Sequence, residues 1–122
     1  MSYKATQNLH EVEKEFFSKF RNRVTNSKKV DDLRRAFTIS VADLLGTLLH
    51  EEISLDGEDV SFSPEKKDHY RISEEFKGSP PVFEILNDPE IRQILKKAAQ
   101  TAHHRYLHLK KHPEKTELKI RN

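Results

Sequence analysis

The spacing of the apolar residues most constrains what this chain can fold into. In three long stretches, apolar side chains recur at intervals of three and four residues, which is the period of an amphipathic α-helix. The stretches cover about residues 7–25, about residues 30–50, and a segment that begins at Asn87 or Asp88 and ends at Pro113. We therefore expect three long helices, and the short polar connection after the first helix makes the first two antiparallel neighbours.

The second predicted helix is apolar on two sides. One side carries the regular stripe from Val30 to Leu48. The other side carries small or apolar residues, namely Ile39, Ala42, Gly46 and Leu49. A helix of this kind normally lies between two layers of neighbours. Because few other helices are available, we expect the second layer to come from another copy of the chain, most simply in a homodimer.

The segment between the second and third long helices changes period. In residues 51–63, apolar and polar residues alternate on either side of Asp56 and Gly57, which predicts a β-hairpin with a two-residue turn. Tyr70 and Ile72 are candidates for a third short strand. A single hairpin is marginally stable alone, so we expect it to lie on the helices.

A short helix is expected over about residues 80–87, because Ser79 and two prolines mark its start. The predicted fold is mainly α. It is a small helical bundle of three long helices plus one short helix, with a minor β-hairpin between the second and third long helices. We expect residues 1–113 to form a single helical domain. Residues 114–122 are polar and charged, and we expect them to form a disordered C-terminal tail.

Composition excludes several classes of protein. The chain has no cysteine, which rules out a disulfide framework, a thiolate zinc site and a cysteine nucleophile. Its most apolar stretch, from Ala36 to Leu49, is too short to span a membrane and contains Asp43. The first residues lack the apolar run of a signal peptide. We therefore expect a cytoplasmic protein that does not associate with membranes.

Residues 103–112, which read HHRYLHLKKH, concentrate histidine and basic side chains near the end of the last predicted helix. His104, His108 and His112 are each four residues apart, and this spacing stacks imidazoles on one helix face, where adjacent pairs chelate one ion. The three histidines are candidate ligands of Zn²⁺ or Ni²⁺. A carboxylate from another element or from a second subunit would complete the metal site. A solvated polar face is the alternative.

The same part of the chain carries the positive charge expected of a nucleic-acid surface. Residues 88–122 hold nine basic and four acidic residues, so they can attract an anionic partner such as RNA or DNA. Contacts would follow the phosphate backbone, since no helix-turn-helix, RRM or zinc-finger pattern is visible. The candidate contact residues are Lys96, Lys97, Arg105, Lys110, Lys111 and Lys115.

Arg105 and His112 have six residues between them. This arrangement distantly resembles the arginine-to-histidine motif of the HEPN family, which are small all-helical dimeric ribonucleases. The resemblance implies that Arg105 stabilises phosphate charge and that His112 serves in acid and base transfer across a dimer cleft, without a metal. Tyr106 stands where the family commonly has a polar residue.

From the sequence we expect a small non-catalytic interaction or regulatory protein, with a second copy or another protein as its partner. No group of residues combines a nucleophile, a base and an oxyanion device, and no phosphate-binding loop is present. RNA binding through the last helix, metal binding at its histidines, and HEPN-like RNA cleavage are the alternatives.

Overall fold

The computed structural model describes residues 9–50, 52–55, 57–78 and 80–111. Its three long helices are α1 (Leu9–Asn26), α2 (Val30–Leu49) and α5 (Pro89–Lys111). All three lie at the positions that the apolar spacing predicts. The predicted tail at 114–122 lies outside the described residues.

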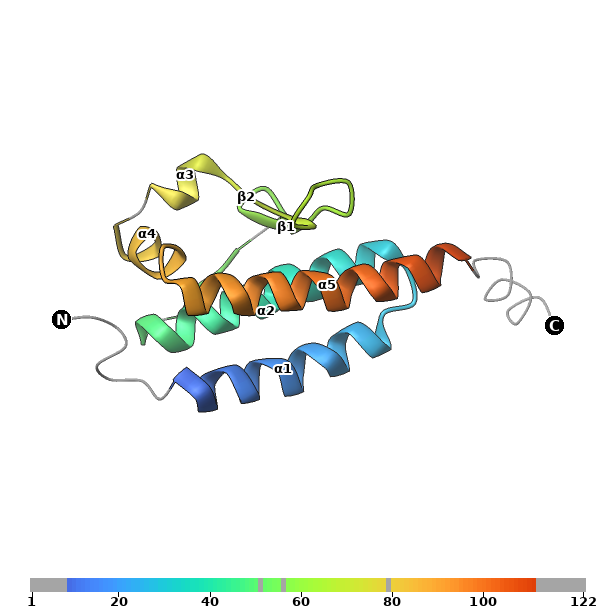
Figure 1. Ribbon diagram of the computed structural model, residues 1–122, viewed down its shortest axis with the longest axis horizontal. Helices are drawn as coiled ribbons and strands as arrows, with labels where there is room; N and C mark the ends of the chain where they lie inside the picture. Colours follow the sequence, from blue (N-terminus) through green and yellow to red (C-terminus); the bar gives the residue numbers. More distant parts are fainter. Residues whose placement is uncertain (1–8, 51, 56, 79, 112–122) are drawn as a thin grey trace.

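The shorter elements all lie between α2 and α5 in the chain. They are β1 (Val60–Phe62), β2 (Tyr70–Ile72), α3 (Glu74–Lys77) and α4 (Pro80–Leu86). Figure 1 shows α1, α2 and α5 running alongside one another, with the two strands, α3 and α4 gathered on the side away from α1. The predicted mainly α bundle with a minor β-hairpin is confirmed. None of the described helices is long and apolar enough to cross a membrane.

Aromatic rings connect the layers of the core. Phe20 of α1, Phe37 of α2 and Phe62 of β1 are almost completely buried. The ring centroids of Phe20 and Phe37 are 6.3 Å apart, and those of Phe37 and Phe62 are 6.4 Å apart. Phe62 also lies 5.9 Å from the ring of Tyr106 on α5. One hydrophobic cluster therefore includes all three long helices and the hairpin.

Two arginines join neighbouring elements through polar contacts. Arg23 of α1 lies 2.8 Å from the carboxylate of Asp43 and donates to the hydroxyl of Ser40 at 2.9 Å, both on α2. Arg105 of α5 donates to the backbone carbonyl of Ser27 at 2.7 Å. Ser27 belongs to the connection between α1 and α2, so this hydrogen bond fixes the C-terminal part of α5 against that connection.

The hydrogen bonds between β1 and β2 set the direction of each backbone group. The strands are antiparallel, with Ser61 opposite Arg71. The backbone N–H of Ser73 donates to the carbonyl of Asp59 at 2.9 Å. Ser73 lies two residues after Arg71, and Asp59 lies two residues before Ser61. Because bonded pairs alternate with non-bonded pairs in an antiparallel ladder, Ser61 and Arg71 are a bonded pair. The residues beside them direct their backbone groups away from the partner strand.

In this register, the two outer edges of the hairpin differ in whether their backbone groups are hydrogen-bonded. On β1, the carbonyl of Val60 points toward α2 and accepts a hydrogen bond from the Thr38 hydroxyl at 2.8 Å. On β2, the backbone groups of Tyr70 and Ile72 have no hydrogen-bond partner among the described residues. One edge is therefore closed by α2, and the other is open.

The position of the hairpin corrects the prediction. We predicted pairing within residues 51–63, but β1 pairs with β2, which contains the candidate strand residues Tyr70 and Ile72. Ile53 and Leu55 form no strand; both are partly buried against the core. Packing of these two side chains against the core accounts for the alternating pattern, and no partner strand is involved. Of the predicted turn, Gly57 lies in a turn before β1, while Asp56 lies outside the described residues.

Candidate binding groove

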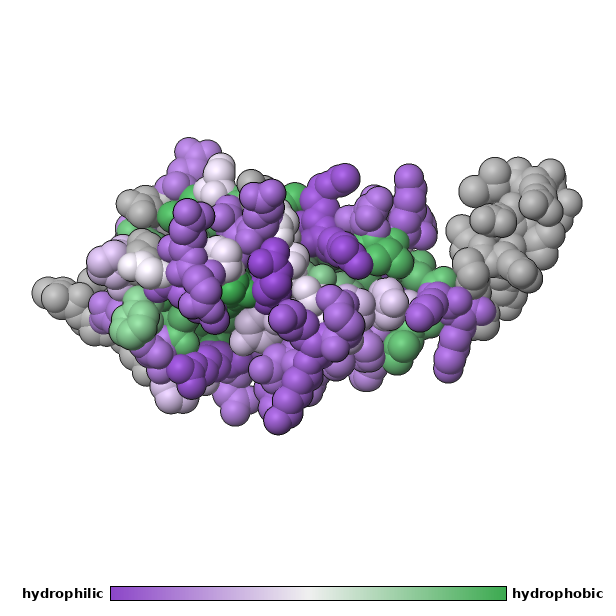
Figure 2. Space-filling view, turned by 90° about the horizontal axis from the view of Figure 1, so that it is seen from above, coloured by the Kyte–Doolittle hydropathy of each residue, from purple (hydrophilic) through white to green (hydrophobic). Residues whose placement is uncertain are grey.

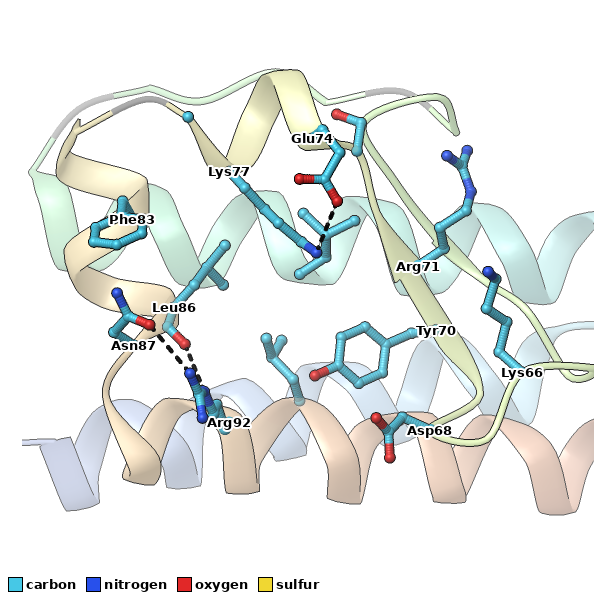
Figure 3. Close-up of a pocket in the computed structure, with 14 residues that line it drawn as sticks. Lys66, Asp68, Tyr70, Arg71, Glu74, Lys77, Phe83, Leu86, Asn87 and Arg92 are labelled. Atoms are coloured by element: carbon cyan, nitrogen blue, oxygen red, sulfur yellow. Dashed lines mark hydrogen bonds and ion pairs between the residues drawn. The ribbon is translucent and has the colours of Figure 1, made fainter.

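An open groove of about 910 Å³ lies between β2 and α4, with α5 beneath it (Figure 3). We call it the β2–α4 groove. Figure 2, seen from above the view of Figure 1, shows hydrophobic surface exposed between hydrophilic side chains. The lining residues are Lys66, Asp68, Tyr70, Arg71, Ile72, Ser73, Glu74, Lys77, Gly78, Phe83, Leu86, Asn87, Arg92 and Leu95.

The wall formed by α4 presents an exposed aromatic side chain. Val82 and Ile85 are three positions apart, share one helix face and are buried in the bundle. Phe83 is next along the helix, about 100° away from Val82, and it lines the groove. Its side chain is 60% exposed, although its ring is fully apolar. Phenylalanine is enriched at protein interfaces, so this exposed ring beside a hollow is a candidate contact residue.

The guanidinium of Arg92 is fixed where α4 ends. Its Nε donates to the carbonyl of Leu86 at 3.0 Å, and its Nη2 donates to the side-chain oxygen of Asn87 at 3.1 Å. The last carbonyls of a helix have no partner within the helix, so this arginine satisfies one of them. Within the described residues, Nη1 of Arg92 has no hydrogen-bond partner, so it can bind a ligand.

Lys77 extends from α3 into the groove (Figure 3). Ser73 caps this short helix, because its hydroxyl oxygen accepts a hydrogen bond from the backbone N–H of Phe76 at 3.1 Å. The ammonium of Lys77 lies 3.5 Å from the carboxylate of Glu74, and both side chains are largely exposed. Exposed pairs of this kind contribute little to stability, so an anionic ligand can compete with Glu74 for Lys77.

Tyr70 contributes a hydrogen-bond donor from the opposite wall. Its ring lies 6.1 Å from Phe37, and Figure 3 shows its hydroxyl directed into the groove. Burial raises the pKa of the Tyr70 hydroxyl, the nearby Asp68 carboxylate raises it further, and Arg92 lowers it. The phenol therefore keeps its proton at neutral pH.

The lining brings together several groups that can bind a ligand. Lys77, Arg92 and the Tyr70 hydroxyl converge on one hollow whose other surfaces include apolar side chains. Arg71 points elsewhere, since its Nη2 donates to the carbonyl of Gly57 at 3.2 Å. The lining offers positive charge, a neutral donor and apolar contact, which are the properties of a recognition site.

The described residues include two of the three candidate metal ligands. His104 and His108 are exposed on α5, and His112 lies outside the described residues. No group of three or more metal-binding side chains occurs in the part of the chain that the structure describes. Zinc or nickel binding at these histidines stays a prediction.

A different histidine of the same stretch makes a close contact. The ring of His103 stacks on the ring of His69, which precedes β2, with centroids 3.9 Å apart and planes within 4°. The Nδ1 of His69 donates to the carbonyl of Pro64 at 3.2 Å, while Nδ1 of His103 is buried without a partner among the described residues. Burial lowers the pKa of His103, and the nearby His69 and His104 lower it further. His103 is therefore neutral at physiological pH.

The candidate nucleic-acid contacts lie mostly on the exposed surface of α5. Lys96 and Lys111 are exposed. The ammonium of Lys97 lies 5.2 Å from the ring centroid of Phe17, and that of Lys110 lies 5.6 Å from the ring centroid of Tyr106. Lys115 falls outside the described residues. The described lysines thus form a basic surface, two of them with their charge over an aromatic face.

Arg105 is placed differently from these lysines. It is half-buried, and its hydrogen bond to the carbonyl of Ser27 gives it a structural role. Its predicted partner in the HEPN-like arrangement, His112, lies outside the described residues. The pairing of Arg105 with His112 therefore stays a prediction.

The predicted self-association face is largely enclosed within one chain. Ala42 is buried, Gly46 is half-buried, and Leu49 packs against the core. Ile39 is 42% exposed and lies beside a shallow hollow between α1 and α2. Ile39 is thus the residue of this face that offers substantial apolar surface to a second copy.

Sequence reasoning did not identify the groove. Phe83 falls outside the apolar face of a very short helix, and Lys77 belongs to α3, which was not predicted. One signal was available for α3: Ser73 followed by two glutamates is typical of a helix start. The approach of β2 to α4, which creates the groove, depends on tertiary packing.

Comparison with known proteins identifies no relative. No protein-family model matches the sequence, and no curated protein or solved structure is detectably similar to it.

Proposed function

We propose that this protein is a non-catalytic interaction module that binds a partner protein in the β2–α4 groove. The observation that carries the proposal is the convergence of an exposed aromatic ring, Phe83, with two cationic side chains, Lys77 and Arg92, on one open hollow. Phenylalanine and arginine are both enriched at protein interfaces, and arginine is among the residues that most often dominate the binding energy. Arg92 is already fixed by its hydrogen bonds, so binding costs little side-chain ordering at that residue.

The test is selection from a displayed random-peptide library against the whole chain. The groove should enrich peptides whose binding is lost in Phe83→Ala. Leu107→Ala is the matched control, because Leu107 is also a large exposed hydrophobic residue (40%) but does not line the groove. Peptides that bind wild type and Phe83→Ala equally would refute the proposal.

RNA binding by α5 is a second candidate function. It is supported by the exposure of Lys96, Lys97 and Lys111 on one helix. Binding of a labelled mixed-sequence RNA should weaken steeply with salt and with the double substitution Lys96→Ala/Lys97→Ala. HEPN-like RNA cleavage by Arg105 and His112 stays a prediction.

We also propose that the protein is cytoplasmic and forms a homodimer through the exposed side of α2. The exposed side chain of Ile39 supports this assembly. Sedimentation velocity of wild type and Ile39→Glu tests it, since a dimer that depends on this face should dissociate in the variant. A wild-type monomer at high concentration would refute it.

A further inference from the structure

We propose that the β2–α4 groove binds an extended segment of its partner as an additional strand on β2, with acidic side chains of that segment placed at Lys77 and Arg92. The inference rests on the proposed function and specifies the partner's conformation and charge. The argument depends on the open edge of β2, the position of that edge in the groove, and the charges around it.

The open edge of β2 supplies the backbone partners. Arg71 directs its backbone groups to β1, so Tyr70 and Ile72 direct their N–H and carbonyl groups to the outer edge. These groups have no hydrogen-bond partner in the described part of the chain. Unpaired groups at a strand edge are a template for another strand, and several peptide-binding domains use such an edge.

The edge of β2, rather than one of its faces, borders the groove. Successive side chains of a strand point to opposite faces, yet four consecutive residues, Tyr70 to Ser73, line the groove. The other edge of the hairpin is closed by the bond from Thr38 to Val60. With about 160 Å³ for each strand residue, from the usual spacings of strands and sheets, a groove of about 910 Å³ accommodates about six residues.

The charges and apolar surfaces fit a segment in which acidic and apolar residues alternate. Nη1 of Arg92 is available to a carboxylate, and Lys77 can exchange its exposed pair with Glu74 for a ligand carboxylate. Phe83 and Leu86 are available to apolar side chains. Neighbouring side chains of the added strand point in opposite directions, so an alternating segment presents acidic side chains on one face and apolar side chains on the other. Asp68 lies in the same lining, which disfavours a uniformly anionic polymer such as RNA.

The probe is an acetylated, amidated hexapeptide of alternating glutamate and valine, added to the isotope-labelled full chain. Amide hydrogen exchange at β2 is the readout. The N–H groups of Tyr70 and Ile72 should become protected when the peptide binds. The N–H of Arg71 is an internal control, because it already bonds to β1 and should change little.

Variants and modified peptides test the components separately. Lys77→Glu should weaken binding of the glutamate peptide by about fivefold, whereas Lys96→Glu, on exposed α5 outside the groove, should leave it unchanged. Methylation of alternate peptide nitrogens should abolish binding without changing charge. A peptide of alternating lysine and valine should bind more weakly than the glutamate peptide.

The outcomes separate this inference from the proposed function. Protection of Tyr70 and Ile72 together with loss of binding on methylation supports the added strand. Groove-dependent binding without that protection, or equal binding of the lysine peptide, overturns the inference and leaves the interaction module in place. If neither this peptide nor any library peptide binds in a Phe83-dependent manner, both proposals are refuted.

Discussion

Replacing Thr38 with valine tests how the hairpin is held against α2. Valine has nearly the same shape as threonine and is also branched at Cβ, so packing and backbone preference change little. What is lost is the hydroxyl that donates to the carbonyl of Val60 at 2.8 Å. Val60 is 1% exposed and its carbonyl points away from β2, so water and the neighbouring strand cannot replace the bond.

A buried carbonyl left without a donor costs about 1–3 kcal/mol. For a chain of this size, that cost lowers the melting temperature by about 3–10 °C. Urea unfolding of wild type and Thr38→Val measures the difference in free energy directly. Amide exchange should also become faster in β1, because the hairpin loses a contact that fixes it to α2.

Thr101→Val is the matched control for this substitution. The hydroxyl of Thr101 donates at 3.1 Å to the carbonyl of Lys97, one turn earlier in α5, and this bond joins no second element. We expect a change within about 0.5 kcal/mol. If both variants lose equal stability, the bond from Thr38 to the strand contributes nothing specific and the reasoning is wrong.

Three further predictions follow from the structure. Stability should fall as pH drops below about 6.5, because a lowered pKa of His103 means that the unfolded chain binds more protons in that range. His103→Gln should flatten the pH dependence of urea unfolding, whereas substitution of the exposed His10 of α1, His10→Gln, should not. Arg105→Met should lower the free energy of unfolding by about 1–3 kcal/mol through the lost bond to a backbone carbonyl, and an unchanged urea midpoint would contradict this. Phe37→Ala should lower the free energy of unfolding by about 3–5 kcal/mol, because its ring is fully buried. Phe83→Ala should lower it by under about 0.5 kcal/mol, because Phe83 is 60% exposed. Equal shifts of the melting temperature would refute this assignment.

The long helices were predictable because their apolar residues repeat over many turns. Phe16, Phe20 and Val24 lie on one face of α1 and are buried as expected. The hairpin was harder, because alternation over two or three residues does not distinguish a paired strand from an extended segment. Ile53 and Leu55 alternate just as Val60 and Phe62 do, but only β1 finds a partner.

The groove could not be predicted because none of its properties belongs to one segment. Phe83 is conspicuous only once α4 is known to bury Val82 and Ile85 on its other side. In the sequence, Arg92 is one of nine basic residues in the segment 88–122, but its role depends on the end of α4 lying beside it. Sequence patterns predict which residues are buried within an element, whereas a groove depends on the distance between elements.

The contact between Arg105 and Ser27 has a consequence for synthesis of the protein. The two residues are 78 positions apart, so α1 and α2 emerge from the ribosome well before α5 can cover them. At usual rates of translation, the roughly sixty residues from the end of α2 to the end of α5 take about 3–12 s to make. During that interval the apolar side of the α1–α2 pair is open to chaperones, and its final packing awaits the last turns of α5.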